Sequence, residues 1–540
     1  MSFSSVFARV SQVAVFGFVI AVLSQAMFAQ DVCPPPPHSI SSPTLPTDVI
    51  PCATNGINNF DDFSWRSFVA LIWPAAQGQR GVPDVNQTTF PVSGPLVFET
   101  YKADWESFPP PNAPNPPPPP APWQDFAGGN NPCGSPVNVG WGNMVLASYT
   151  KFGNLGLAGF GNFFTGPLIA SGFSTQAMQQ YARFQASYNQ TEYDQILGNK
   201  WYLQTNLGDL TFCSNGATIK GQACPAENSV DLKSAWIDMT TIPQAQQSRY
   251  YTTQAWVLDP TTGVCSQRTM GLVGLHIVSK TPSRPQWIWS TFEQIDNVPA
   301  VTGATPTDNT VFNFNDGTGA PMPGNDPYCI PGQTGCPGTN PPTVAMPASA
   351  AQATRFNVTR VKPIGIGAAT TPATNSAYQS LFAKNAPGSP WQYYELVMSQ
   401  WPVPGNTPAN PGFPKFSFPG KIHKGDDASS FANTILETFD QESVTTGCMN
   451  CHNATAHPQG PTLPGNDFLW SLAINAYPPP SSLPHARLMA ARSGVNSSTM
   501  AALKSLAALQ KGAIAANEVL MKKPGKKPAG KHKTAKPPNK

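Results

Sequence analysis

The chain has 540 residues, of which 11% are charged and 60 are proline, and its formal net charge is +3. This length allows a large core and two or more domains, while the low charge and the many prolines predict a loop-rich globular protein. The near-neutral balance excludes the strongly basic surface of a nucleic-acid-binding protein, and we expect no such partner.

Residues 1–29 are predicted to be a cleaved export signal. Arg9 is the one charge before the apolar stretch 13–23, and small or polar residues near Ala26 and Ala29 fit a cleavage region. The apolar stretch is too short to cross a bilayer comfortably, which makes an uncleaved anchor the lesser alternative. The signal predicts a periplasmic or otherwise exported bacterial protein.

The cysteine count agrees with export. Two of the 10 cysteines belong to the motif at 448–452, which leaves 10 − 2 = 8 others. An even number of cysteines in an exported chain predicts disulfides, with reduced buried thiols as the alternative. Short loops favour the pairs Cys33–Cys52, Cys213–Cys224 and Cys329–Cys336.

Residues 30–420 are predicted to form a large β-rich domain with peripheral helices, within an α+β fold. An amphipathic helix covers 58–73 and stops at Pro74, and we expect it to pack on a sheet. From residue 229 onward the apolar residues alternate with a period of two, which predicts an antiparallel meander. Its strands are 229–240, 250–258, 267–281 and 287–295, and a further strand is expected at 390–401.

Two proline-rich stretches interrupt this domain. The first, 109–122, predicts a polyproline-type surface excursion without a core of its own, and the second, 317–347, a loop or insertion. The uncharged stretch 152–173 is rich in glycine and contains Pro167, which favours a buried loop over a membrane helix. We therefore expect no integral membrane span once the signal is removed.

Residues 425–520 are predicted to form a small helical segment. A helix capped at Asp426 or Asp427 is expected to end at Gly447. A short apolar helix or turn follows at 467–474, and an alanine-rich helix at 497–520.

The tail, 521–540, carries eight lysines and no acidic residue. A disordered solubilising extension is the usual form of such a tail, and electrostatic docking onto an acidic redox partner or an anionic surface is the sharper alternative.

The residues from Cys448 to His452 spell Cys-x-x-Cys-His, the attachment signature of a covalently bound c-type haem. Both thiols can form thioether bonds to one porphyrin, and the adjacent imidazole then becomes the proximal ligand of the iron. A redox dithiol needs a βαβ setting and a zinc site needs a second ligand pair, and neither context is visible. A structural disulfide beside a chance histidine is the third alternative. We predict that Cys448, Cys451 and His452 bind haem c, and that the helical segment 425–520 is cytochrome c-like.

The sixth ligand of the iron stays open. A strong second ligand favours electron transfer, whereas a vacant position permits oxygen or peroxide chemistry. His276, in an apolar strand beside Trp287 and Trp289, is a candidate distal ligand, and a hydrogen-bonded core histidine is the alternative. Three residues beyond the motif could also return to the iron: His485, Met489 and Met500.

Four segments resemble a group of bacterial exported cytochrome c family proteins with one haem motif near the C-terminus. The segments are 63–74, 270–281, 285–299 and 447–452. The resemblance implies haem binding and electron transfer, and it carries over Cys448, Cys451 and His452 as the haem-binding residues.

The predicted function is that of an exported mono-haem c-type cytochrome that exchanges electrons with a partner protein. The size of the non-haem part supports an alternative, a peroxidase-like or oxygenase-like haem enzyme with an open distal position and a substrate pocket in the large domain. A haem-containing sensor or scaffold is a third, non-redox possibility. Glycine-rich nucleotide loops, His-Glu-x-x-His and a convincing serine elbow are not found in the sequence.

Overall fold

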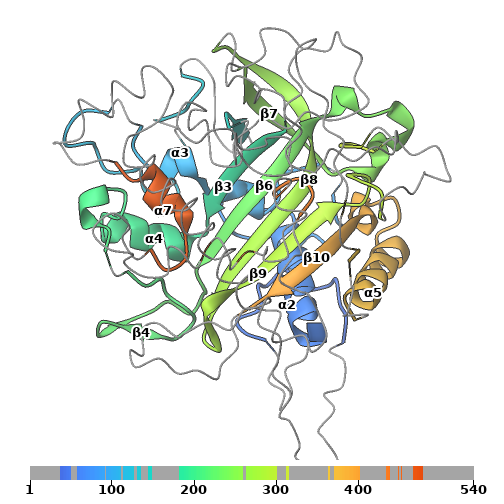
Figure 1. Cartoon of the computed structure of the whole chain (residues 1–540), viewed down its shortest axis with the longest axis horizontal. Helices are drawn as coiled ribbons and strands as arrows, with labels where there is room; N and C mark the ends of the chain where they lie inside the picture. Colours follow the sequence, from blue (N-terminus) through green and yellow to red (C-terminus); the bar gives the residue numbers. More distant parts are fainter. Residues whose placement is uncertain are drawn as a thin grey trace, which may run out of the picture.

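The computed structural model describes an α+β fold in which one large curled sheet carries a few helices (Figure 1). The predicted fold class is confirmed at this level. The predicted signal, the interval 317–347, the helix at 497–520 and the lysine-rich tail lie outside the described residues. Those described are 37–49, 57–91, 93–110, 113–126, 130–134, 144–148, 182–208, 210–259, 263–300, 312–315, 360, 363–364, 370–401, 433–437, 448, 452 and 466–477.

Eight strands of the described residues join in the sheet, in the order β1-β3-β6-β8-β7-β2, with β9 and β10 continuing from β8. A separate small hairpin is made by β4 (Thr218–Ile219) and β5 (Gln222–Ala223). The strands of the large sheet are β1 (Lys102–Ala103), β2 (Met144–Leu146), β3 (Arg183–Tyr188), β6 (Val230–Asp238), β7 (Thr252–Leu258), β8 (Cys265–Thr281), β9 (Arg284–Gln294) and β10 (Tyr394–Gln400).

The five predicted strands are confirmed as β6 to β10 and pair with one another in antiparallel, but the predictions of an all-antiparallel sheet and of a simple meander order are both wrong. β2 pairs with β7 in parallel, so the sheet is mixed rather than antiparallel. β6 and β7 are consecutive in the chain and do not pair with each other; both pair with β8. The cause is the length of β8, whose 17 residues receive β6 along one edge and both β7 and β9 along the other.

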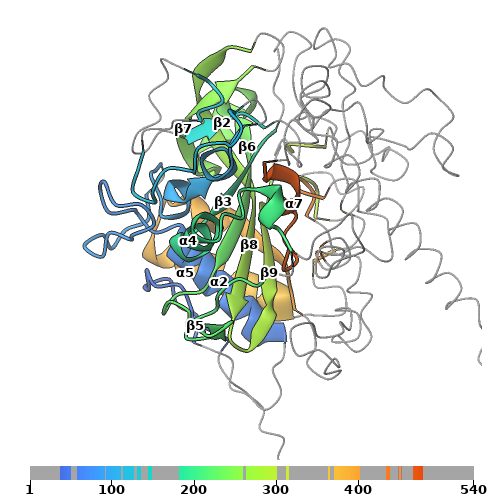
Figure 2. The ribbon, with the colours of Figure 1, turned by 90° about the vertical axis from the view of Figure 1, so that its left-hand side faces the viewer.

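Helices cover both faces of the sheet (Figure 2). α2 (Ile57–Leu71) and α5 (Thr370–Asn385) lie against β9 and β10, and α7 (Trp470–Asn475) lies on the opposite side. The remaining α-helices are α3 (Asp104–Ser107) and α4 (Gln190–Gly198). Short 3₁₀ turns are η1 (Phe98–Thr100), η2 (Gln204–Asn206), η3 (Met239–Thr241), η4 (Gln244–Arg249) and η7 (Pro390–Tyr393).

The helix predicted at 58–73 is confirmed as α2, and it ends before Pro74. It is buried on nearly all sides instead of on one face, because its acidic residues have partners within the core. Asp61 accepts hydrogen bonds from Thr371 of α5 at 2.7 Å and from Ser399 of β10 at 2.9 Å. α5, which the sequence pattern did not predict, thus supplies part of the covering layer.

The proline-rich stretch at 109–122 is predicted to be extended and without a core of its own, and the structure adds contacts between its described residues and the body of the protein. The hydroxyls of Tyr193 and Tyr477 donate to the carbonyls of Ala121 and Ala113, the second at 2.9 Å. Burial recurs at 117, 120 and 123, which is the three-residue repeat of a polyproline helix. The segment is therefore extended, as predicted, and one edge of it packs against the core.

Two disulfides are present among the described residues, and such bonds are typical of proteins that fold in an oxidising compartment. Cys213–Cys224 confirms one predicted pair. Cys133–Cys265 was not predicted, because it joins residues 132 positions apart that only the fold brings together. The other four non-motif cysteines lie outside the described residues. No helix in the described ranges is long and apolar enough to cross a membrane.

Removing Cys133–Cys265 by a double alanine substitution is expected to cost more stability than removing Cys213–Cys224. The separations are 132 and 11 residues, and closing the longer loop restricts the unfolded chain more. Loop entropy predicts losses of about 5 and about 3 kcal/mol respectively. Denaturant unfolding of the two variants measures this difference, and equal losses would show that loop entropy does not govern it.

A buried carboxyl group, that of Glu99, makes the stability of the fold depend on pH. Burial raises its pKa from 4.5 to about 7, although it accepts hydrogen bonds from the hydroxyl of Tyr251 and the backbone of Leu96. Because the folded state holds the proton more tightly, this group favours folding below about pH 4.5, and that contribution is lost as the pH rises through about 7.

Through Glu99, the native protein is expected to lose about 3 kcal/mol of unfolding free energy between pH 4.5 and 8. The variant Glu99→Gln should not show this loss. The glutamine oxygen can accept the same two hydrogen bonds without carrying a charge. Urea unfolding across that pH range measures the effect. An unchanged pH dependence in the variant would contradict it.

Candidate haem-attachment site

His452 of the Cys-x-x-Cys-His motif is helical, half-buried and packed against the sheet. Its ring lies on Trp289 of β9, with ring centroids 4.3 Å apart and planes tilted by 52°. Trp289 is itself buried. The motif histidine therefore sits against a rigid aromatic surface on the strand that the sequence analysis singled out for its paired tryptophans.

The hydrogen bond of His452 defines which of its ring nitrogens carries the proton. Nδ1 lies 2.7 Å from the backbone carbonyl oxygen of Phe468. A carbonyl oxygen can only accept, so Nδ1 must donate, and in the neutral ring the lone pair then belongs to Nε2. Histidines that bind a metal commonly have this arrangement, with one nitrogen donating to a carbonyl and the other facing the metal. The described part of the motif fits an iron-binding imidazole.

The acceptor carbonyl is held by an unusual stretch of backbone. Asp467 and Phe468 have φ angles of 50° and 74°, in the left-handed region that residues other than glycine rarely adopt. Two such residues in succession persist only where the surrounding structure determines them, and they concentrate at functional sites. The turn comes immediately before α7, and it directs the Phe468 carbonyl to His452.

Asp467 supplies the contacts that determine this turn. Its Oδ2 lies 2.5 Å from Nζ of Lys280 and accepts a hydrogen bond from the Phe212 backbone at 2.7 Å. Its carbonyl oxygen accepts from the indole of Trp287 at 2.9 Å. Burial raises the pKa of Asp467, and the charge of Lys280 opposes that shift. The ion pair is thus enclosed, and it joins the chain beside His452 to β8.

Of the two motif thiols, Cys448 lies within the described residues and Cys451 lies outside them. Cys448 is helical, half-buried and packed against the main hydrophobic core. The described thiol and the described imidazole of the motif therefore both contact the body of the protein.

His276, the predicted distal ligand, lies on the same face of the sheet as Trp289. His276 is opposite Thr291 in the β8–β9 register, and Trp289 is two residues along the same face. The side chain of His276 is 12% exposed, and its Nε2 lies 3.2 Å from a carboxylate oxygen of Glu437. The structure brings the two histidines to one face, and it gives His276 an acidic neighbour that the sequence did not predict.

Residues 433–437 cover this face, and the rest of the helix predicted from Asp426 to Gly447 lies outside the described residues. They form a turn whose backbone amides at Ile435 and Leu436 donate to the side chain of Asn433, at 3.0 and 3.1 Å. Asn433 also donates to Thr291 of β9 at 2.9 Å. This is the bonding of a helix N-cap residue, and the amide of Glu437 also donates to the Asn433 carbonyl at 2.9 Å, as in a first helical turn.

Three acidic residues lie close together near α7: Glu192, Asp231 and Asp467. Glu192 of α4 is fully buried, and neither of its carboxylate oxygens has a hydrogen-bond partner in the described part of the chain. Burial, followed by the charges of Asp231 and Asp467, raises its pKa well above the usual range. Within the described ranges, no group of three or more His, Cys, Asp or Glu side chains is placed to hold a metal ion.

Sequence reasoning missed Asp467, Phe468 and Glu437. The role of Phe468 resides in a backbone carbonyl, which any residue carries, so no residue type could have indicated it. The other two are acids whose partners lie far away in the chain: Lys280 for Asp467 and His276 for Glu437. The remaining candidate ligands, His485, Met489 and Met500, lie outside the described residues.

No family model, curated protein or solved structure matches the chain.

Proposed function

We propose that this chain is an exported electron-transfer protein that carries one haem c, bound covalently by Cys448 and Cys451 and ligated by His452. The observation that carries the proposal is the hydrogen bond from Nδ1 of His452 to the Phe468 carbonyl at 2.7 Å, within the Cys-x-x-Cys-His motif. A backbone acceptor at that nitrogen leaves the metal-binding lone pair on the other.

When bound, the haem supplies one-electron redox chemistry. The residues of this chain hold and orient its ligand. Trp289 packs against the imidazole, the Phe468 carbonyl keeps the proton on Nδ1, and Asp467 holds that carbonyl through its ion pair with Lys280. A hydrogen-bond acceptor at the proximal ring also makes the imidazole a stronger ligand.

The proposed location is the bacterial periplasm. The predicted signal at 1–29 and the two disulfides both support export. The proposed partner is a redox protein with an acidic face, to which the lysines of 521–540 would be attracted by long-range electrostatics.

A second candidate function, a peroxidase-like or oxygenase-like haem enzyme, is favoured by the contact of His276 with Glu437. An imidazole whose Nε2 lies 3.2 Å from a carboxylate is drawn toward that carboxylate instead of toward a metal. His276 would then line an open distal position as a polar side chain, whereas the electron-transfer role is best served by a strong sixth ligand.

Visible spectra of the mature protein, produced in a host able to attach haem c, test both candidates. Pigment that stays with the protein in acidified organic solvent supports covalent haem, and colourless protein would refute the proposal. Reduced protein whose spectrum ignores carbon monoxide supports electron transfer. Ready binding of the gas supports the enzyme.

A further inference from the structure

A cavity of about 220 Å³ lies on the side of the sheet opposite the haem motif. Ser279 of β8 lines it, while the next residue, Lys280, forms the ion pair with Asp467 on the other face. One wall is the extended segment 43–47, which Asn228 fastens by donating to the carbonyl of Thr47 at 2.8 Å. The cavity is therefore separate from the haem-attachment site, and a hydrogen bond within the protein fixes the segment that forms this wall.

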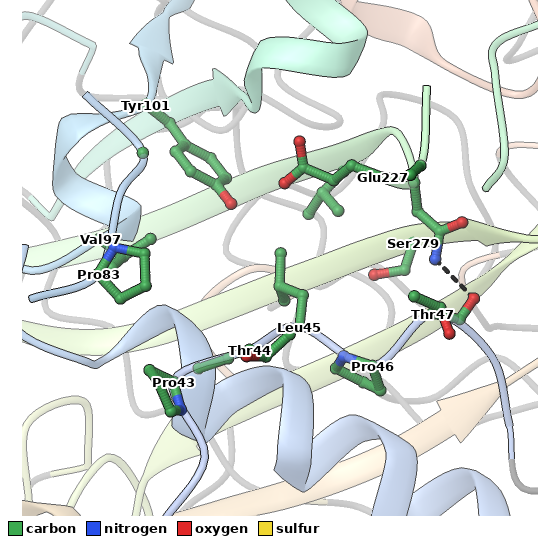
Figure 3. A pocket seen from close by; sticks show the side chains of 15 residues that line it. Pro43, Thr44, Leu45, Pro46, Thr47, Pro83, Val97, Tyr101, Glu227 and Ser279 are labelled. Atoms are coloured by element: carbon green, nitrogen blue, oxygen red, sulfur yellow. Dashed lines mark hydrogen bonds between the residues drawn. The ribbon is translucent and has the colours of Figure 1, made fainter. Parts of the chain in front are cut away.

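The lining is mainly apolar, with a few polar groups that converge. Prolines, Val97 and Leu45 form most of the surface. Figure 3 shows the hydroxyl of Tyr101 and the carboxylate of Glu227 pointing toward one another across the cavity, with the hydroxyl of Ser279 turned into the same space. Small-molecule sites commonly combine such walls with a few oriented polar groups.

The two hydroxyl groups lack protein partners although their residues are buried. Tyr101 and Ser279 are each 3% exposed, and within the described residues neither hydroxyl makes a hydrogen bond. Neither hydroxyl is one of the fully enclosed polar atoms that lack a partner, so both oxygens reach the open space of the cavity, where water or a ligand can bond to them. A ligand that donates hydrogen bonds would satisfy both.

The charge at the mouth of the cavity indicates which class of ligand can bind there. Glu227 is an exposed residue at the mouth, and Thr191 donates to one of its oxygens at 3.2 Å. Partial burial of its carboxyl group raises its pKa, and hydrogen bonds with Thr191 and Asn189 oppose that shift. No lysine or arginine of the described residues forms an ion pair with it. Burial, and then the nearby charge of Glu227, raise the pKa of Tyr101 well above its ordinary value. An anion would be repelled here, and a cation would gain a carboxylate and an aromatic ring.

We propose that this cavity binds a small organic cation, a primary amine with an apolar body, whose ammonium group donates to Glu227 and Tyr101. Carboxylate, phenol and serine oxygens can all accept from an ammonium group, which has three donors. The cavity is smaller than the 300–1,000 Å³ of typical drug-sized sites, which limits the body to a short alkyl or single-ring group.

Isothermal titration of the full mature protein with methylamine, butylamine and benzylamine tests the proposal, with methanol, butanol and benzyl alcohol as neutral counterparts. At least one amine is expected to bind about tenfold or more tightly than its alcohol. Glu227→Gln should weaken that amine about ten- to a hundredfold, because it removes a charge-assisted hydrogen bond. Tyr101→Phe should weaken it several-fold.

Asp194→Asn is the matched control, since Asp194 is an exposed carboxylate on nearby α4 that does not line the cavity. It should leave amine binding unchanged, and its unaffected binding would locate the site at Glu227. The proposal is overturned by amines that bind no better than alcohols, by binding that Glu227→Gln leaves unchanged, or by no binding at all. Because Glu227 is exposed, its substitution should leave folding intact, which far-ultraviolet circular dichroism checks.

Discussion

Replacing both Cys448 and Cys451 by alanine is expected to yield an exported chain that carries no covalent haem. Each thioether needs one of these thiols, and the Cys-x-x-Cys-His spacing lets both bond to a single porphyrin. Loss of the visible absorption and of pigment retention in acidified solvent measures the effect. It should be complete, because no other Cys-x-x-Cys-His sequence occurs in the chain.

The matched control is the double alanine variant at Cys213 and Cys224, which form a disulfide. It removes two thiols and costs stability, but it should keep its haem. Equal loss of haem from both variants would mean that the effect comes from misfolding, and haem retained without Cys448 and Cys451 would refute the attachment site.

Replacing Asp467 with alanine is expected to lower the free energy of unfolding by about 3–5 kcal/mol, the usual cost of breaking a buried ion pair by removing one partner. The side chains of Lys280 and Asp467 are only 3% and 7% exposed, so the lysine charge would stay buried. Alanine also tolerates the φ of 50° less well than aspartate does. Denaturant unfolding measures the loss.

The Asp467 variant should also change the spectrum of the haem, because the turn that holds the Phe468 carbonyl would loosen and His452 would lose its acceptor. Asp296→Ala is the control: it breaks the 2.6 Å pair with Arg249, which does not contact the motif. It should destabilise the protein and leave the spectrum unchanged. A stable, spectrally normal Asp467 variant would contradict the positioning role.

The sequence predicted the elements whose local pattern is strong. α2 has apolar residues at helical spacing and a proline after its end, and β6 to β10 alternate apolar and polar side chains between turn residues. The sheet order was not predictable in this way, because β8 is long enough to pair with three strands and only tertiary packing selects them. The same holds for the disulfide Cys133–Cys265, whose partners are 132 residues apart.

The amino-acid sequence by itself determined which chemistry we propose for the candidate site, because thiol attachment to a porphyrin requires two cysteines and a histidine at one short spacing. Tertiary structure alone decided what surrounds that histidine. Trp289, the Phe468 carbonyl and the Lys280–Asp467 pair come from distant parts of the chain, and their contacts depend on strand register and on a left-handed turn. Local sequence carries no record of such long-range contacts.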